Sequence, residues 1–87
     1  MYSIRFAKKA AKIYKRVDAV TVRRINNILK RLEENPFNLP NTKHLKAELA
    51  ESYRIRMGNI RVIYSVNDSD KTVYIEVIGF RGDVYKK

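Results

Sequence analysis

The spacing of hydrophobic residues changes several times along the chain, and each change predicts a new element. Residues 2–6 alternate apolar and polar side chains, which is the period-two pattern of a half-buried strand. From residue 7 the apolar positions recur at i, i+3, i+4 and i+7, with lysines and arginines elsewhere around the helix, which predicts an amphipathic helix. These apolar positions are Ala10, Ile13, Tyr14 and Val17.

A second helical stripe follows Asp18, which either caps the second helix or lies in the turn before it. The stripe consists of Ile25, Ile28, Leu29 and Leu32. Asn35-Pro36 ends this helix, because the residue before a proline is pushed out of the helical region. Residues 35–44 hold both prolines, which predicts a rigid connector that returns the chain to the sheet rather than a domain boundary.

Three strand-like runs complete the chain, at residues 52–57, 60–66 and 72–79. Gly58-Asn59 separates the first two runs and residues 67–70 separate the last two. The predicted fold class is therefore α+β, in the order β-α-α-β-β-β, with two helices packed on one face of an antiparallel sheet. At 87 residues, the chain is expected to form one domain, residues 1–87.

A two-residue loop at Gly58-Asn59 predicts how the middle hairpin pairs. Met57 then lies opposite Ile60, and Arg56 lies opposite Arg61. Since side chains alternate between the faces of a sheet, one face of this hairpin becomes apolar. The other face gathers Arg54, Arg56 and Arg61, on the side that the helices leave uncovered.

A four-residue loop at 67–70 extends the register to the last strand. It pairs Tyr64 with Val73, Val62 with Ile75 and Ile60 with Val77. On the uncovered face, Arg61 is expected opposite Glu76, Ile63 opposite Tyr74, and Ser65 opposite Thr72. In this register Glu76 is expected to be an ion-pair partner of Arg61.

Positive charge is not confined to the middle hairpin but prevails over the whole chain. Lys and Arg number 19 against nine Asp and Glu, a net charge of +10. A compact domain with this excess most often meets nucleic acid, less often an anionic membrane or an acidic protein. No cysteine is present, which removes disulfides, thiolate metal sites and thiol nucleophiles. The chain has no signal-like start and no run near the about 18–20 apolar residues that span a bilayer, so a cytoplasmic protein without a membrane partner is expected.

The arginine pair on the middle hairpin needs a reason, because like charges directly opposite one another in a sheet destabilise it by up to about 1 kcal/mol. A bound phosphate supplies one, since guanidinium groups hold phosphate oxygens bidentately. A solvated basic face, with Arg61 paired to Glu76, is the competing interpretation. Arg81 and Tyr85 follow the last strand and favour the phosphate, because both can fold over the same sheet edge.

The segments "LKAEL", "YRIRMGNIRVIYSV" and "KTVYIEVIGFRGDVYKK", in this order, resemble the RelE/ParE toxin superfamily, and specifically its RelE-type messenger-RNA interferases. The resemblance covers the whole chain. It implies a toxin that cleaves messenger RNA in the decoding site of the ribosome, without a metal or another cofactor, through attack of a ribose 2′-hydroxyl on its own 3′-phosphate. It also implies inhibition by a RelB-like antitoxin.

The family's site residues match five positions of this chain. The resemblance assigns Arg54 and Arg56 to gripping RNA and stabilising charge, and Arg61 to the scissile phosphate. It assigns Arg81 to the leaving group, and Tyr85 to stacking on a base. Well-described members carry lysines at the first two positions, and an arginine, with its pKa above 12, is a poor general base.

Several other interpretations stay open at this point. A ParE-type inhibitor of DNA gyrase, or an RNA-binding toxin without catalysis, would use the same fold. His44 is the only histidine, which excludes paired-histidine chemistry, and it is expected to be a surface or loop-packing residue. Basic residues on the helices are expected to be mostly solvated, with some touching ribosomal RNA. They are Lys8, Lys9, Lys12, Lys15, Arg16, Arg23, Arg24, Lys30 and Arg31.

Overall fold

A computed structural model describes residues 1–37, 42–45 and 51–80 of the chain. Strand β1 (Ser3–Phe6) leads into helix α1 (Lys8–Arg16) and helix α2 (Ala19–Glu34). Strands β2 (Thr42–Leu45), β3 (Glu51–Met57), β4 (Ile60–Asn67) and β5 (Thr72–Phe80) follow. The predicted α+β class is confirmed, and the six predicted elements occur in the predicted order, with β2 as an additional strand.

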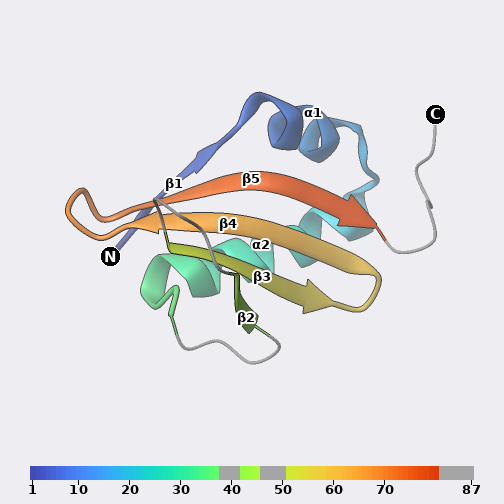
Figure 1. Ribbon diagram of the computed structural model, residues 1–87. Helices are drawn as coiled ribbons and strands as arrows, with labels where there is room; N and C mark the ends of the chain where they lie inside the picture. Colours follow the sequence, from blue (N-terminus) through green and yellow to red (C-terminus); the bar gives the residue numbers. More distant parts are fainter. Residues whose placement is uncertain (38–41, 46–50, 81–87) are drawn as a thin grey trace.

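The five strands form one sheet in the order β1-β5-β4-β3-β2 (Figure 1). Two features differ from the prediction. The connector expected at residues 35–44 contains β2, an edge strand that pairs antiparallel with β3. In addition, β1 pairs with β5 in parallel, so the sheet is mixed rather than wholly antiparallel. The strand directions explain the parallel pair, because β2 runs opposite to β1 and the three antiparallel pairings that follow bring β5 back into the direction of β1.

Asp18 resolves the alternative left open by the sequence. It is the N-cap of α2, where its side chain accepts a hydrogen bond from the Thr21 backbone N–H at 3.1 Å. This bond satisfies one of the N–H groups that a helix start leaves without a partner. The helix ends at Glu34, and Asn35 is its C-cap with an extended backbone immediately before Pro36, as the sequence predicts.

Both helices lie against the sheet (Figure 1), and apolar side chains of the helices and the strands form the core between them. Ala10 of α1 and Ile25, Ile28 and Leu32 of α2 are fully buried, and no polar or charged residue is buried in the described part of the chain. The sheet contributes Tyr53, Ile55, Ile60, Val62, Tyr64, Val66, Val73, Ile75 and Ile78. We call the side of the sheet that carries these residues the covered face.

Tyr64 lies at the centre of the covered face. Its ring stacks on Tyr53 with the centroids 5.5 Å apart, and its hydroxyl donates a hydrogen bond to the Pro36 carbonyl at 2.8 Å. Burial disfavours the charged phenolate and raises the pKa of Tyr64 to about 12. Tyr64 and Tyr53 therefore have the packing role that their positions predict, and they anchor the chain beyond α2 to the sheet.

The β3–β4 hairpin has the predicted register. Met57 pairs with Ile60, Arg56 with Arg61, Ile55 with Val62 and Arg54 with Ile63. Gly58 has a φ of 60°, and among the described residues only it and Lys71 have a positive φ. Because φ is positive at Gly58 but not at Asn59, the turn is of type II′, which favours glycine at its first central position and matches the twist of the strands.

The predicted β4–β5 register is wrong. Tyr64 pairs with Ile75, Val66 with Val73, and Asn67 with Thr72. The four-residue loop lies one position later than predicted, because Asn67 ends β4 and its side chain accepts a hydrogen bond from the Asp70 N–H at 3.2 Å. The resulting shift of two residues in the pairing leaves each side chain on its original face.

A β-bulge then changes the second half of β5. The register shifts between Ile63 and Tyr64, and Glu76 has no Cα partner on β4. Beyond the bulge Ile63 pairs with Val77, and Val62 pairs with Ile78. Val77, predicted opposite Ile60 in the core, is instead 40% exposed, and Ile78 takes the buried position.

Candidate RNA-contact face

The face of the sheet opposite the core, which we call the open face, carries the arginines of the β3–β4 hairpin. Arg54 and Arg56 come from β3, and Arg61 comes from β4, at alternate positions to the buried residues of the same strands. Arg56 and Arg61 are exposed and Arg54 is half-buried. The three arginines thus share one surface, near the β3–β4 turn.

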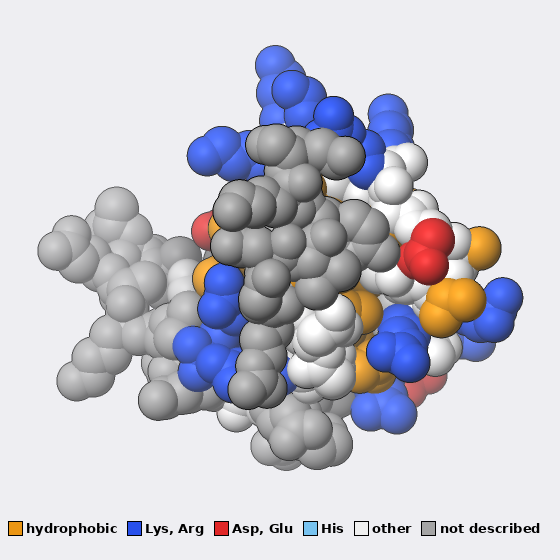
Figure 2. All heavy atoms as spheres, turned by 90° about the vertical axis from the view of Figure 1, so that its right-hand side faces the viewer, with side chains coloured by type: hydrophobic (Ala, Val, Ile, Leu, Met, Phe, Trp, Pro, Cys, Tyr) orange, Lys and Arg blue, Asp and Glu red, His pale blue; other side chains and the backbone are white. Residues whose placement is uncertain are grey.

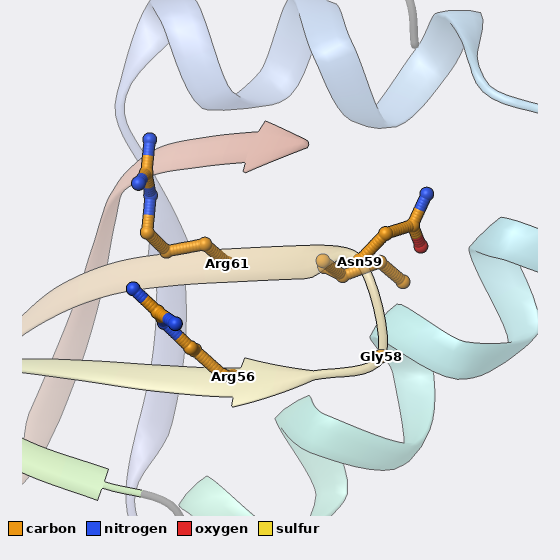
Figure 3. Close-up of a pocket in the computed structure, with 5 residues that line it drawn as sticks. Arg56, Gly58, Asn59 and Arg61 are labelled. Carbon is orange, nitrogen blue, oxygen red and sulfur yellow. The ribbon is translucent and has the colours of Figure 1, made fainter. Parts of the chain in front are cut away.

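Arg56 and Arg61 form a directly opposed pair. Figure 3 shows both side chains projecting to the same side of the hairpin, whereas Asn59 points the other way. With Gly58, Asn59 and Ile60 they line a hollow of about 230 Å³. Within the described part of the chain, no ion pair or side-chain hydrogen bond involves Arg54, Arg56 or Arg61.

Gly79 has no side chain and so leaves room for the Arg61 side chain. The two residues are opposite one another on β4 and β5, and a Cβ atom built on Gly79 would lie 3.3 Å from the Arg61 Nη2 atom. The guanidinium group therefore lies over the bare backbone of β5. A glycine inside a strand often marks such a close approach, and the glycine in "EVIGF" is the sequence signal for this contact.

The predicted ion pair between Arg61 and Glu76 is wrong. The shifted register and the bulge place Gly79, not Glu76, opposite Arg61. The Glu76 carboxylate instead accepts a hydrogen bond from the Ser65 hydroxyl at 2.8 Å. The structure therefore does not support the competing interpretation, in which Glu76 neutralises Arg61 on a solvated face.

A further arginine approaches the hairpin from helix α2. A Cβ atom built on Gly58 would lie 3.5 Å from the Arg24 Nη1 atom, so the Arg24 head group lies beside the β3–β4 turn. Figure 2 views this end of the molecule and shows many more lysine and arginine side chains than carboxylates among the coloured residues. The sequence alone predicts Arg24 only as one of the basic helix residues, which are expected to be mostly solvated with some touching ribosomal RNA.

Two of the five predicted site residues, Arg81 and Tyr85, lie outside the described residues, and so does the side chain of His44. Their roles stay predictions. Among the residues that are described, no group of histidine, aspartate and glutamate side chains could hold a metal ion. Nor does the described chain include a helix of the length and apolarity needed to cross a membrane.

The open face can bind an anion through several guanidinium groups at once. Each carries a permanent charge and a planar set of donors that match phosphate oxygens. Because no described carboxylate competes for them, these donors are available to a ligand. The arrangement can hold a phosphodiester and stabilise added negative charge on it, but arginine is a poor proton acceptor.

The fold is that of RelE-type toxins. A chain of the archaeal RelE–RelB complex from Pyrococcus horikoshii OT3 is 29% identical, with a TM-score of 0.82 over 94% of this chain and 97% of that chain. A chain of the RelBE2 toxin–antitoxin complex from Mycobacterium tuberculosis is 26% identical, with a TM-score of 0.75 over 92% and 98%. The isolated RelE toxin of E. coli, 22% identical with a TM-score of 0.78 over 98% and 92%, shares the fold.

A match to a protein-family model assigns the chain to a class of toxin. The model described as ParE toxin of type II toxin-antitoxin system, parDE, matches residues 1–85, and the chain therefore belongs to this family within the RelE/ParE superfamily. A comparison with curated protein sequences gives no match.

Proposed function

We propose that this toxin is a ribosome-dependent endoribonuclease that cleaves messenger RNA in the A site and thereby inhibits translation. The observation that carries the proposal is the group formed by Arg54, Arg56 and Arg61 on the open face, without an ion-pair partner in the described chain. The opposed Arg56–Arg61 pair costs stability when nothing is bound. A phosphodiester is the ligand that turns this repulsion into binding energy.

The proposed reaction needs no metal ion. The ribose 2′-oxygen forms a bond to the adjacent phosphorus, the bond from phosphorus to the 5′-oxygen breaks, and the products are a 2′,3′-cyclic phosphate and a 5′-hydroxyl end. The proton of the 2′-hydroxyl leaves to a base and the 5′-oxygen takes up a proton. The phosphorane between these states carries extra negative charge, which prearranged cations stabilise.

Each arginine has a distinct proposed role. Arg61, held over Gly79, contacts the scissile phosphate, while Arg54 and Arg56 grip the RNA and stabilise its charge. Arg81 stabilises the leaving group and Tyr85 stacks on a base. None of the arginines is assigned as the general base, since a guanidinium group does not release its proton near neutral pH. A ribosomal group or the substrate itself is left to supply that function.

The proposed partners follow from the same charge. A RelB-like antitoxin inhibits the toxin, as the archaeal RelE–RelB and mycobacterial RelBE2 complexes suggest by likeness. A net charge of +10 favours an acidic antitoxin and also favours ribosomal RNA as a docking surface. The proposed place of action is therefore the cytoplasm.

Inhibition of DNA gyrase is a second candidate function, because the matching family model describes ParE toxins. Such a toxin binds a protein and needs no arrangement of arginines around a phosphodiester. The arginines of the open face, which have no ion-pair partner among the described residues, favour the RNA-cleaving function.

The test incubates purified toxin with ribosomes programmed with a defined message and maps the RNA ends, beside a gyrase supercoiling assay. We expect a cut in the A-site codon, no cut in the same message without ribosomes, and unchanged supercoiling. An intact message at stoichiometric toxin contradicts the proposal. Inhibition of supercoiling in the same preparation then assigns the gyrase function.

A further inference from the structure

The open face extends beyond the arginines to an exposed aromatic residue. Tyr74 of β5 is 43% exposed, and no ring contact, hydrogen bond or ion pair involves it within the described chain. It lies beside Arg5 of β1, its Cα partner in the parallel pair, and beside Ser65 of β4. An exposed ring beside a guanidinium group is the usual composition of a surface that stacks an unpaired base.

The bulge in β5 enlarges this apolar surface. Without it, alternation from buried Ile75 would turn Val77 toward the core. With it, Val77 is 40% exposed and lies opposite Ile63 on the open face. Bulges commonly redirect side chains near functional sites. We call Arg5, Ile63, Tyr74 and Val77 the Tyr74 patch.

The patch is continuous with the arginines. Arg54 lies opposite Ile63, and Ile63 lies opposite Val77, so the apolar residues join the arginines directly through the sheet register. From Arg61 to Ser65, beside Tyr74, β4 advances four residues, which is about 13 Å. This is a distance of a few nucleotides along an extended strand of RNA.

Charge selects the kind of ligand. The open face receives four arginines from β1, β3 and β4, namely Arg5, Arg54, Arg56 and Arg61. Glu76 is the one carboxylate that the described parts of β1, β3, β4 and β5 add to this face, and the Ser65 hydroxyl already donates to it. A polyanion with flat unpaired bases fits this combination better than an acidic peptide, which offers charge without bases to stack.

We propose that the Tyr74 patch is a second nucleotide subsite, which binds single-stranded RNA a few nucleotides from the scissile phosphate. The Tyr74 ring stacks on a base, Arg5 binds a phosphate of the same strand, and Ile63 and Val77 contact the nucleotides between. The subsite rests on the proposed function, because it extends the RNA-binding surface of that same site. Through this subsite the toxin contacts the message outside the cleaved codon.

The test measures binding of the full chain to a fluorescein-labelled oligouridine of about ten nucleotides, by fluorescence anisotropy over a series of salt concentrations. We expect Tyr74→Leu to weaken binding about tenfold or more, since a stacked base contributes strongly to affinity. Tyr74→Phe keeps the ring and keeps the affinity within about twofold. Arg5→Gln weakens binding and lowers the slope of log affinity against log salt by about 0.7.

Lys71→Gln is the matched control for Arg5→Gln. It removes one positive charge from the β4–β5 turn, where Lys71 donates to Asp68 at 3.3 Å. We expect a smaller effect on affinity than that of Arg5→Gln. Circular dichroism of each variant checks that the fold is retained. A 4-thiouridine in the same RNA is expected to crosslink to the peptide that contains Tyr74.

Several results overturn the subsite. These are unchanged affinity of Tyr74→Leu, absence of binding by the wild-type chain, or a Tyr74→Leu chain that loses an antitoxin but keeps RNA. The last result assigns the patch to a protein partner. Cleavage on programmed ribosomes is scored separately. A wild-type toxin that cleaves, with Tyr74→Leu affinity unchanged, contradicts only the subsite, whereas Tyr74-dependent binding without cleavage contradicts only the proposed reaction.

Discussion

The two faces of the sheet are formed by the same strands, but one carries buried apolar side chains and the other carries exposed charged ones. On the covered face, Ile60, Val62 and Tyr64 of β4 are at most 2% exposed and pack in the core. On the open face, Arg61 of the same strand is exposed and has no described ion-pair partner. Alternation along each strand thus assigns neighbouring residues to stability and to binding.

This division means that the open face can be altered without unfolding the protein. An 87-residue domain has only about 5–15 kcal/mol of stability, and its core supplies most of it. Repulsion between the opposed arginines lowers this stability. The packing of the covered face must therefore offset a charged surface that does not stabilise the fold.

The sharpest test of the division compares two adjacent residues of β5. Ile75→Ala removes a fully buried side chain from the covered face, and we expect a loss of about 2–5 kcal/mol in the free energy of unfolding. Tyr74→Ala removes an exposed side chain from the open face, and we expect a loss below about 1 kcal/mol. Urea denaturation followed by circular dichroism measures both. Equal losses would contradict the division.

A smaller effect, on activity rather than stability, is expected at Gly79. A Cβ at this position lies 3.3 Å from the Arg61 Nη2 atom, so Gly79→Ala shifts the guanidinium group slightly and Gly79→Val shifts it further. We expect Gly79→Val to lower the cleavage rate about tenfold, with Gly79→Ala between it and the wild type, because small misplacements of a catalytic group are costly. Thermal denaturation provides the control, and a loss of stability that parallels the loss of rate would argue against a positioning role.

The Tyr64 hydroxyl provides a test on the covered face. Tyr64→Phe removes its hydrogen bond to the Pro36 carbonyl, and we expect a loss of about 1 kcal/mol in stability at pH 7. Burial in the folded state raises the pKa of Tyr64 from its ordinary value of 10.0 to about 12, so folding favours the neutral phenol. The resulting stabilisation is complete below pH 10 and is lost as the pH rises toward 12.

Denaturation between pH 8 and pH 12 checks this pH dependence. The wild-type chain is expected to lose stability faster than Tyr64→Phe above pH 10, because only the wild type carries the Tyr64 phenol, which ionises in the unfolded chain but stays neutral when it is buried. Parallel curves for the two chains would contradict the assigned cause. Tyr2, whose pKa is raised by its hydrogen bond to Asp68, is present in both chains and cancels in the comparison.

The smallest effect is expected at the arginine pair itself. Arg56→Gln relieves the repulsion with Arg61, and we expect the free energy of unfolding to stay within about 1 kcal/mol of the wild type, on the stabilising side. The gain should shrink as salt is added, because both groups are exposed and screened. A clear loss of stability would show that Arg56 supports the fold and would weaken the case for a phosphate ligand.

The two hairpins show how far the sequence predicts this fold. Gly58-Asn59 permits only a short turn, so the β3–β4 register and the shared face of the three arginines follow from two residues. The β4–β5 loop has no such constraint, because either end of "NDSD" can be part of a strand. The choice is made by the Asn67 side chain, which closes the turn by bonding the Asp70 N–H.

The bulge and the second edge strand depend on contacts that the sequence does not display. Period-two alternation in β5 continues through Glu76 without a visible break, yet Glu76 has no Cα partner on β4 and Val77 turns outward. β2 is short and contains no strong apolar alternation, and it forms because β3 offers it an edge. For the candidate site, alternation predicts that three arginines share one face. It does not predict that the Arg61 guanidinium lies over Gly79 or that Arg24 approaches the β3–β4 turn, because both contacts depend on the folded arrangement of strands and helix.

The most direct test of the central claim is the rate of message cleavage on programmed ribosomes by the wild-type toxin and by Arg61→Ala. The account predicts cleavage in the A-site codon by the wild type and a loss of about 100-fold or more in Arg61→Ala. It also predicts that Arg61→Ala is at least as stable as the wild type. Cleavage by Arg61→Ala at the wild-type rate would contradict the claim that the open-face arginines act on the RNA phosphate.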